Sequence, residues 1–356
     1  MELGHNSSVK DTNSTFDQTK FDHSISSTHS ISNNSNESRV PGIESNNLAG
    51  SSTWESVRAS VLKKVSAYVL ALRPWSFSAS LTPVFLGCAL AHKLQPASFV
   101  TLLLTALTAL SVHAAGNVVN TYYDYVKGID SKKSDDRILV DKILCKDELV
   151  TLGVMLYLIG CGGFVILAMI SPGRFEHLAL VFFGGMSCSF LYTGGIGFKY
   201  IALGDLMIII IFGPITVLFS FMVQTGQVQF STILYAVPLA LNAEAILHSN
   251  NTRDMESDKK AGIVTLAILL GKTASEVLFA FFLFTPYSFF AIWTLKYSIW
   301  LGLPIITISE AFKIEKHFRI SKHYIPKWTA RLNFYFGFLY VFGVVLTDIS
   351  KLPYVL

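Results

Sequence analysis

The chain has 356 residues, of which 51% are hydrophobic and only 15% are charged. Soluble domains carry roughly 25% charged residues, so this composition excludes an ordinary soluble fold and indicates that most of the chain faces lipid or other helices. The net charge of +4 is too small to favour nucleic acid as a partner.

Residues 1–55 differ from the rest of the chain. They are rich in Ser, Asn and Thr and poor in large apolar residues, so they cannot bury enough surface to fold and are predicted to be disordered. They show neither the apolar core of a signal peptide nor the Arg-rich pattern of a transit peptide. Residues 56–72 are predicted to form an amphipathic juxtamembrane segment, followed by a membrane domain at 73–348 and a short tail at 349–356.

Nine hydrophobic runs follow, and each approaches the roughly 20 residues that a helix needs to cross a bilayer. The sequence therefore predicts an all-α, polytopic membrane protein. The runs lie at about 75–94, 99–122, 149–171, 177–193, 203–223, 232–250, 273–294, 299–315 and 332–348.

The distribution of basic residues predicts the orientation. With nine spans, the N-terminus and the loops after the second, fourth, sixth and eighth spans share one side of the membrane. That side carries nearly all Lys and Arg after residue 55, the exceptions being Lys93, Arg174, Lys296 and Lys351. Because cytosolic loops are enriched in basic residues, the N-terminus and the charged loops are predicted to be cytosolic. Attraction to an anionic substrate would give the same bias.

The first acidic motif closes the second predicted span. Asn120 and Asp124 are four residues apart and therefore share one face of a helix. Gly128 lets the chain turn into the next loop. That loop contains further charged candidates, namely Asp130, Lys132 and Arg137.

The second acidic motif closes the sixth predicted span. Asn250, Asp254 and Asp258 step by four residues, and each step rotates by only about 40° on a helix. Their oxygens therefore point in one direction, with Arg253 inside the motif. Both motifs fall on the predicted basic side of the membrane.

Two clusters of carboxylate and amide oxygens suit Mg²⁺, which takes few protein ligands and completes its shell with substrate phosphate oxygens. The interspersed Lys and Arg suit the remaining phosphate charge. Polar helix ends in water are the ordinary alternative, but carboxylates near membrane depth mark a functional site by default. An allylic diphosphate fits these features, because Mg²⁺ and cations stabilise its leaving diphosphate and a lipid-embedded cavity shields the carbocation from water.

At these residues the sequence resembles the UbiA superfamily of intramembrane aromatic prenyltransferases, and within it the branch that makes menaquinone (vitamin K2). The resemblance covers about residues 70–348, and implies nine transmembrane helices around a central cavity capped by two Asp-rich loops. It is carried by Arg73-Pro-Trp-Ser-Phe77, Asn120 to Asp130 with Ser134-Asp-Asp-Arg137, Tyr192 to Lys199, and His248 to Thr265.

The resemblance implies roles for individual residues. Asp124, Asp254 and Asp258 would be essential to catalysis, and the implied Mg²⁺ ligands are Asn120, Asp124, Asp130, Asn250, Asp254 and Asp258. Many relatives place the second Asp of the first motif where this chain has Gly128, so direct metal ligation by Asp130 is left open.

Basic and aromatic residues complete the implied site. Lys199 would bind diphosphate and Tyr192 would line the reaction centre, although this pair is seven residues apart here instead of the usual four. Arg73 could bind diphosphate or the acceptor, or could be a membrane-interface anchor. The diphosphate-binding candidates are Asn120, Asn250, Arg137, Arg253, Lys132 and Arg73.

The resemblance implies Mg²⁺-dependent transfer of a polyprenyl group, geranylgeranyl in this branch, from its diphosphate to a quinol such as reduced menadione. It also implies an endoplasmic reticulum or Golgi membrane, with a mitochondrial membrane as the alternative. Two other functions remain open: prenyl transfer to another aromatic acceptor such as 4-hydroxybenzoate, and isoprenoid binding or transport without turnover. An intact second motif favours an enzyme.

Overall fold

The computed structural model describes residues 45–129 and 138–354, and side chains from Trp54 onward. Contacts divide the chain into a first unit, Met1–Glu55, and a second unit, Ser56–Leu356. The first unit is described only by the start of helix α1 (Ser45–Leu72). Residues 45–55, the last part of the segment predicted to be disordered, are the first residues of this helix, and the domain boundaries stay a prediction. The remainder of that expectation lies outside the described residues.

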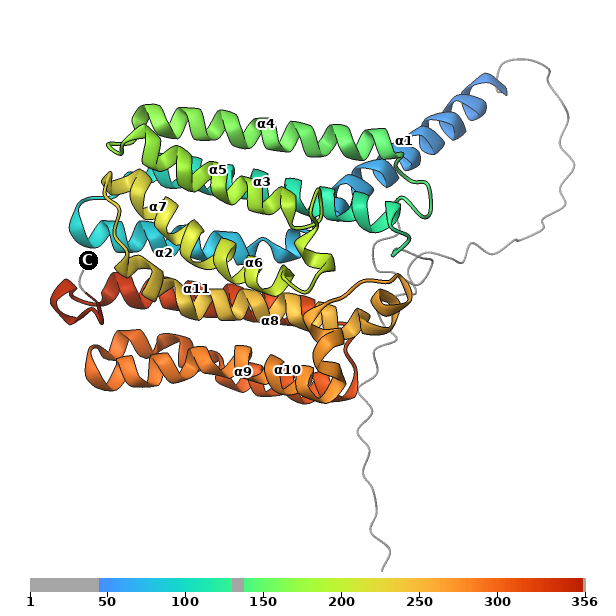
Figure 1. The fold of residues 1–356 in the computed structure, drawn as a ribbon. Helices are drawn as coiled ribbons and strands as arrows, with labels where there is room; N and C mark the ends of the chain where they lie inside the picture. Colours follow the sequence, from blue (N-terminus) through green and yellow to red (C-terminus); the bar gives the residue numbers. More distant parts are fainter. Residues whose placement is uncertain (1–44, 130–137, 355–356) are drawn as a thin grey trace, which may run out of the picture. The chain divides into compact units, whose positions relative to one another are not determined.

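The second unit is an all-α bundle, which confirms the predicted fold class (Figure 1). Every predicted hydrophobic run falls on a helical stretch within residues 45–129 and 138–354. The helices are α2 (Ser78–Leu94), α3 (Phe99–Val126), α4 (Lys146–Ile170), α5 (Phe175–Leu191), α6 (Gly204–Ile210), α7 (Thr216–Thr225), α8 (Ser231–Lys260), α9 (Leu266–Lys296), α10 (Ile308–Ile320) and α11 (Ile325–Leu346).

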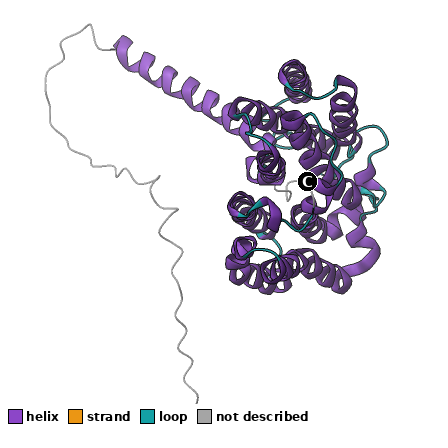
Figure 2. Ribbon diagram, turned by 90° about the vertical axis from the view of Figure 1, so that its left-hand side faces the viewer, coloured by secondary structure: helices purple, strands orange, loops and turns teal. Residues whose placement is uncertain are grey.

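Shorter helical turns join these elements. A π-helical turn, η3 (Ile211–Ile215), links α6 to α7, and a 3-10 segment, η4 (Ile299–Thr307), leads into α10. The other 3-10 turns are η1 (Pro74–Ser76), η2 (Phe198–Tyr200) and η5 (Ile349–Lys351). Viewed down the bundle, most of the long helices appear end-on (Figure 2).

Five helical stretches are long and apolar enough to cross a membrane: α3, α4, Gly204–Thr225, α9 and α11. Large apolar side chains on their outer faces are exposed, as for Met169 at 80% and Leu295 at 87%. Exposed apolar surface of this extent marks a lipid-facing protein. The chain is therefore an integral membrane protein, while the count of nine spans stays a prediction.

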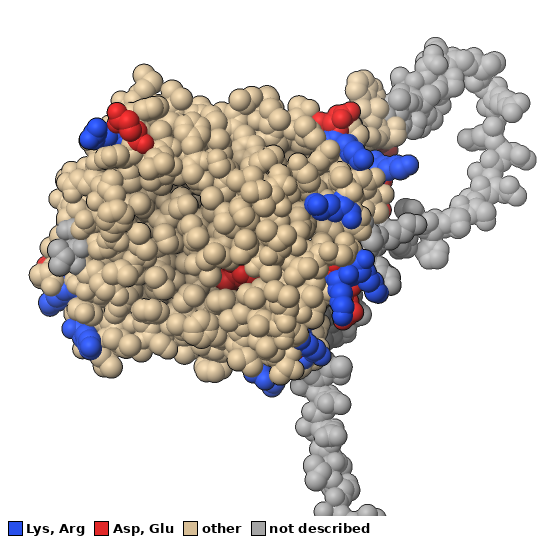
Figure 3. All heavy atoms as spheres, viewed as in Figure 1, with Lys and Arg blue, Asp and Glu red and all other residues tan. Residues whose placement is uncertain are grey.

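Small residues let the helices pack closely around the interior. A Cβ atom on Gly87 of α2 would collide with the backbone of α7, and one on Gly337 of α11 would collide with Thr82 of α2. Small residues at helix crossings allow this close approach in membrane bundles. Between the charged ends of the bundle lies a broad band with almost no charged side chains (Figure 3).

Candidate active site

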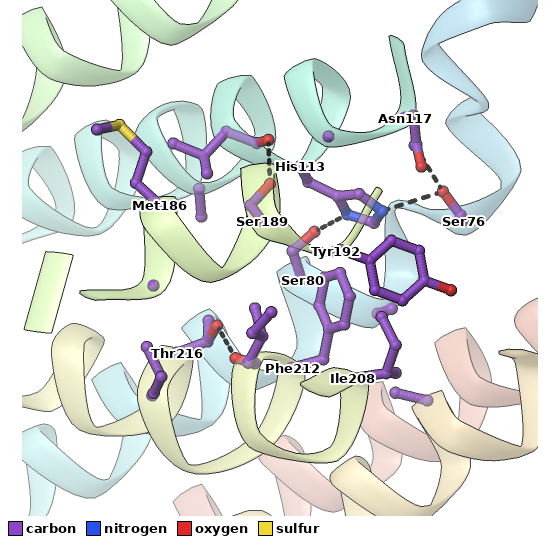
Figure 4. Close-up of a pocket in the computed structure, with 18 of the residues that line it drawn as sticks. Ser76, Ser80, His113, Asn117, Met186, Ser189, Tyr192, Ile208, Phe212 and Thr216 are labelled. Atoms are coloured by element: carbon purple, nitrogen blue, oxygen red, sulfur yellow. Dashed lines mark hydrogen bonds between the residues drawn. The ribbon is translucent and has the colours of Figure 1, made fainter. Parts of the chain in front are cut away.

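One cavity inside the bundle brings together residues from α2, α3, α5, η3, α7 and α8 (Figure 4). Most of its wall is apolar, and includes Phe182, Met186, Ile208, Ile215 and Phe219. Its polar lining contains the asparagines of both acidic motifs together with basic and aromatic candidates: Asn120, Asn250, Arg73, Lys199 and Tyr192. The structure thus gathers at one cavity residues that are distant in the sequence.

The first motif is held by a lysine from another part of the chain. The Lys199 ammonium donates to Asn120 Oδ1 at 2.9 Å and to both carboxylate oxygens of Asp124 at 2.9 and 2.6 Å. The Tyr200 hydroxyl also donates to Asp124 at 3.1 Å. Lys199 and Asp124 are both buried, so this ion pair is screened only weakly by solvent.

The loop from Tyr192 to Lys199 explains how their unusual spacing still brings them to the same cavity. The Lys199 N–H donates to the Tyr192 carbonyl at 2.8 Å and closes the loop. Gly195 and Gly197 have φ of 56° and 66°, a left-handed conformation that glycine adopts without steric penalty. Because the loop folds back on itself, both residues line the cavity.

The second motif is held by its own arginine. Arg253 donates to Asp254 from Nε at 2.7 Å and from Nη2 at 2.8 Å, and to Asn250 Oδ1 at 2.9 Å. The Asn250 amide donates to Asp254 at 3.2 Å. Arg253 therefore bridges the Asn and Asp of one helical turn, as Lys199 does in the first motif.

Asp258 lies one turn beyond Asp254, past the apolar part of α8. It is only 4% exposed. Burial raises its pKa to about 6, with nearby carboxylates adding to the increase and Lys199 and Arg253 opposing it. The charges of Lys199 and Asp124 act on Asp258, so the two motifs are electrostatically coupled.

Both motif helices end with the same hydrogen-bond pattern. Gly128 and Gly262 have φ of 72° and 74°. After α3, the N–H groups of Gly128 and Ile129 donate to Tyr125 and Asp124; after α8, those of Gly262 and Ile263 donate to Lys259 and Asp258. This paired arrangement is the Schellman motif. Gly128 and Gly262 therefore act as helix terminators.

Arg73 stands at the entrance to α2 with a left-handed backbone, φ 51° and ψ 59°. Its guanidinium lies 3.4 Å from the Thr121 hydroxyl and lines the cavity. Non-glycine residues in this conformation are strained, and such strain is concentrated at functional sites.

A second polar group lies in the cavity wall (Figure 4). His113 contacts the hydroxyls of Ser76 at 3.2 Å and Ser80 at 2.5 Å, and the Asn117 amide donates to Ser76 at 3.2 Å. The His113 ring lies between Phe77 and Phe212. The sequence surroundings of His113 are apolar, and only its neighbours in space identify it as part of the cavity.

Three candidate residues, Asp130, Lys132 and Arg137, lie outside the described residues. The cavity lining contains five of the other candidates: Arg73, Asn120, Tyr192, Lys199 and Asn250. Asp124 contacts Lys199, and Asp254 contacts Asn250 and Arg253, while the charges of these groups act on Asp258.

An apolar cavity that ends at oxygen ligands and cations is typical of an intramembrane enzyme for an amphipathic phosphorylated substrate. The comparisons define the class further. Residues 80–342 match the UbiA prenyltransferase family. The chain belongs to this family, whose members transfer prenyl groups.

The chain is similar to the UbiA prenyltransferase domain-containing protein 1 homolog of Drosophila melanogaster, with 61% identity over 83% of each chain. It is 55% identical to UbiA prenyltransferase domain-containing protein 1 of Homo sapiens, over 82% of this chain and 87% of the human protein.

Two solved structures share the fold. A UbiA homolog from Archaeoglobus fulgidus bound to GPP and Mg²⁺ has a TM-score of 0.58 at 17% identity, covering 78% of this chain and 99% of the homolog. The apo UbiA homolog from Aeropyrum pernix K1 has a TM-score of 0.59 at 14% identity, covering 76% and 97%.

Proposed function

We propose that the chain transfers a geranylgeranyl group from its diphosphate to a quinol such as reduced menadione, forming menaquinone with Mg²⁺ as the cofactor. One observation carries the proposal: Asn120, Asn250, Lys199 and Arg73 line a single cavity whose wall is mostly apolar. The Archaeoglobus homolog bound to GPP and Mg²⁺ supports the same ligand classes.

The donor set fits the proposed metal. Asn120, Asp124, Asn250, Asp254 and Asp258 offer only oxygen ligands, which Mg²⁺ prefers. Mg²⁺, when bound there, would neutralise diphosphate oxygens and so favour ionisation of the C–O bond. Asp130 is a further proposed ligand from outside the described residues.

The chain's own residues bind and orient the substrate. Lys199, Arg73 and Arg253 supply positive charge for the diphosphate, and Lys132 and Arg137 are proposed to add to it. Asn250 donates to the proposed metal ligand Asp254, and Asn120 shares the Lys199 ammonium with Asp124. The apolar wall, including Phe182 and Phe219, encloses the prenyl chain and excludes water from the carbocation.

The acceptor is proposed to lie beside Tyr192 and the His113 group. The hydroxyls of a quinol can exchange hydrogen bonds with Ser76, His113 and Asn117. The ring carbon then forms a bond to the prenyl C1 as the diphosphate leaves. The ring loses a proton, which water or a diphosphate oxygen accepts. Without these polar partners, a buried hydroxyl would lose its hydrogen bonds to water.

Membranes that contain the expressed chain provide the test. They are supplied with geranylgeranyl diphosphate, menadione, a reductant and Mg²⁺, and the prenylated naphthoquinone is measured by mass spectrometry. We expect product from the wild-type chain and almost none from Asp254→Asn. Membranes without the expressed chain give the background.

The acceptor is tested in parallel with 4-hydroxybenzoate. Product from 4-hydroxybenzoate and none from menadione would refute the quinol assignment while keeping prenyl transfer. Equal product from wild type and Asp254→Asn would refute the metal site.

The proposed location is an endoplasmic reticulum or Golgi membrane with the motifs on the cytosolic side. Fluorescence microscopy can check the membrane, and selective permeabilisation can check the side.

A further inference from the structure

Three ligand-type side chains meet outside the cavity, where α6 and α8 pack together. Asp205 lies in the first turn of α6, and Glu244 and His248 lie one turn apart on α8. One oxygen or nitrogen from each lies within 4.8 Å of the other two. Asp205 is 5% exposed, and Glu244 and His248 are 0% exposed.

Glu244 is the unusual member of this cluster. Neither of its carboxylate oxygens has a hydrogen-bond partner among the described residues, although the side chain is fully buried and reaches toward His248 and Asp205. Burial of an ionised carboxylate without a partner costs several kcal/mol. This cost is removed when the cluster takes up a positive charge, either as a bound metal ion or as a proton.

The hydrogen bonds of His248 indicate what this charge is. Nε2 lies 3.1 Å from the backbone carbonyl of Ser275 on α9. A carbonyl only accepts, so Nε2 donates to it, and in the tautomer whose single proton is on Nε2 the other nitrogen, Nδ1, presents a lone pair. Nδ1 faces Asp205 Oδ1 at 3.2 Å. For that tautomer the contact is favourable when a proton or a metal ion lies between the two atoms, and a metal-binding histidine typically donates its other N–H to a backbone carbonyl.

The cluster is separate from the reaction cavity. The α8 residues that line the cavity are Ala243, Ile246, Leu247 and Asn250, which share one face of the helix. Because successive residues rotate by about 100°, Glu244 and His248 point toward a different face. The diphosphate motifs do not use Asp205, Glu244 or His248.

We propose that Asp205, Glu244 and His248 bind one Zn²⁺ ion that ties α6 to α8. Two carboxylates balance the charge of the ion, and a histidine nitrogen favours Zn²⁺ over Mg²⁺. Two ligands at tetrahedral positions around zinc are about 3.3 Å apart for bond lengths near 2.0 Å, close to the 3.2 Å between Nδ1 and Asp205 Oδ1. Three protein ligands leave a fourth position for water.

Metal analysis of the full-length chain tests this site. The chain is expressed with zinc in the medium, purified in detergent and washed with Mg²⁺ buffer, and zinc is then counted by plasma mass spectrometry. We expect about one zinc per wild-type chain and a loss of at least fivefold in Glu244→Gln. The matched control is Asn242→Ala, which removes another buried and unpartnered polar side chain from the same helix and should retain the zinc.

A second pair of variants locates the ion. Zinc that persists in Asp254→Asn and disappears in Glu244→Gln belongs to the buried cluster. Zinc lost in Asp254→Asn but kept in Glu244→Gln would overturn the proposal, because the ion would then occupy the diphosphate motifs. A wild-type chain without zinc would also overturn it, since protons alone would then stabilise the carboxylates.

A readout on the wild-type chain covers the case in which Glu244→Gln does not fold. Removal of zinc by a chelator, followed by Co²⁺, should give the visible absorption of a tetrahedral cobalt site; its absence would contradict the proposal. Zinc content is measured without turnover. A chain that holds zinc but forms no prenylated quinone would thus refute the proposed function and leave the zinc site intact.

Discussion

The two acidic motifs use one local design but obtain their positive charge from different places. Each contains an Asn and an Asp one turn apart, bridged by a basic side chain. In the second motif that side chain is Arg253, the neighbour of Asp254. In the first motif it is Lys199, which reaches Asp124 from 75 positions away. One motif is therefore complete within a helix, whereas the other exists only after the chain has folded.

The motifs also differ in where their helices end. Relative to the terminal glycine, Asp124 corresponds to Asp258, since each carbonyl accepts the outer Schellman hydrogen bond. The helix of the first motif thus stops one turn sooner after its Asn. The second motif gains an additional carboxylate within a continuous helix, so we propose that it is the more complete of the two sets of metal ligands.

The largest expected effect comes from the two motif aspartates, whose variants should differ in the stability of the fold. We expect Asp124→Asn and Asp254→Asn each to lower prenyl transfer by roughly 10²–10³-fold, because each removes charge that organises the leaving diphosphate. Only Asp124→Asn should also destabilise the fold, by about 3 kcal/mol, since it leaves Lys199 buried without its counter-charge. Thermal unfolding in detergent measures the difference. Equal unfolding midpoints for the two variants would contradict the view that the first motif depends on a tertiary contact and the second is stabilised within its own helix.

The next effect compares the two bridging cations. Lys199→Gln should reduce transfer by roughly 10²-fold, and Arg253→Gln by about tenfold, because the more exposed Arg253 acts through a medium of higher effective dielectric. Lys199→Arg and Arg253→Lys serve as matched controls that keep the charge. The initial rates of prenyl transfer are compared at saturating Mg²⁺. A larger loss of rate in Arg253→Gln than in Lys199→Gln would contradict the prediction that Lys199 contributes more.

A third prediction uses the raised pKa of Asp258, about 6. Its folded-state pKa lies above the ordinary value of 3.8, so its contribution to stability falls as pH rises between these values. Metal binding requires the carboxylate, so the Mg²⁺ concentration for half-maximal rate should rise about tenfold for each pH unit below 6. Asp258→Asn should need a higher Mg²⁺ concentration for half-maximal rate, and that concentration should change little with pH. A steep dependence in that variant would assign the titration to another group.

The smallest effect tests the shared helix ends. A Cβ atom at Gly128 or Gly262 would meet nothing within 4 Å, so substitution strains only the backbone. Gly128→Ala and Gly262→Ala should each destabilise by about 1–2 kcal/mol, and Gly128→Asn by less. Gly128→Asp should add no Mg²⁺ affinity, because the position is not helical. Tighter Mg²⁺ binding in Gly128→Asp would show that the terminator can act as a ligand.

Much of this arrangement can be predicted from sequence for a physical reason. Apolar runs locate helices because the bilayer fixes their length, and the four-residue steps of Asn250, Asp254 and Asp258 define one helix face. Side-chain partners between helices are less accessible. Nothing in the spacing of Asp124 and Lys199 predicts their contact, and Tyr192 and Lys199 meet through a glycine loop whose conformation depends on two left-handed residues.

The sequence alone indicates least about the two buried histidines. His113 and His248 both lie in apolar sequence surroundings, yet one lines the cavity and the other faces two carboxylates. The direction in which each side chain points depends on how α3 and α8 are rotated in the bundle. Packing between the helices sets that rotation, and the sequence of α3 or α8 alone does not determine it.

In the proposed mechanism, the contact between Lys199 and Asp124 makes the lysine a competitor of the metal ion for the first motif. Metal binding there would displace the ammonium group, which would remain tethered at the cavity. Diphosphate would stabilise the displaced ammonium, so substrate binding would favour metal binding and, by reciprocity, metal binding would favour the substrate. Cooperativity between metal and substrate would then follow from a single displaced side chain.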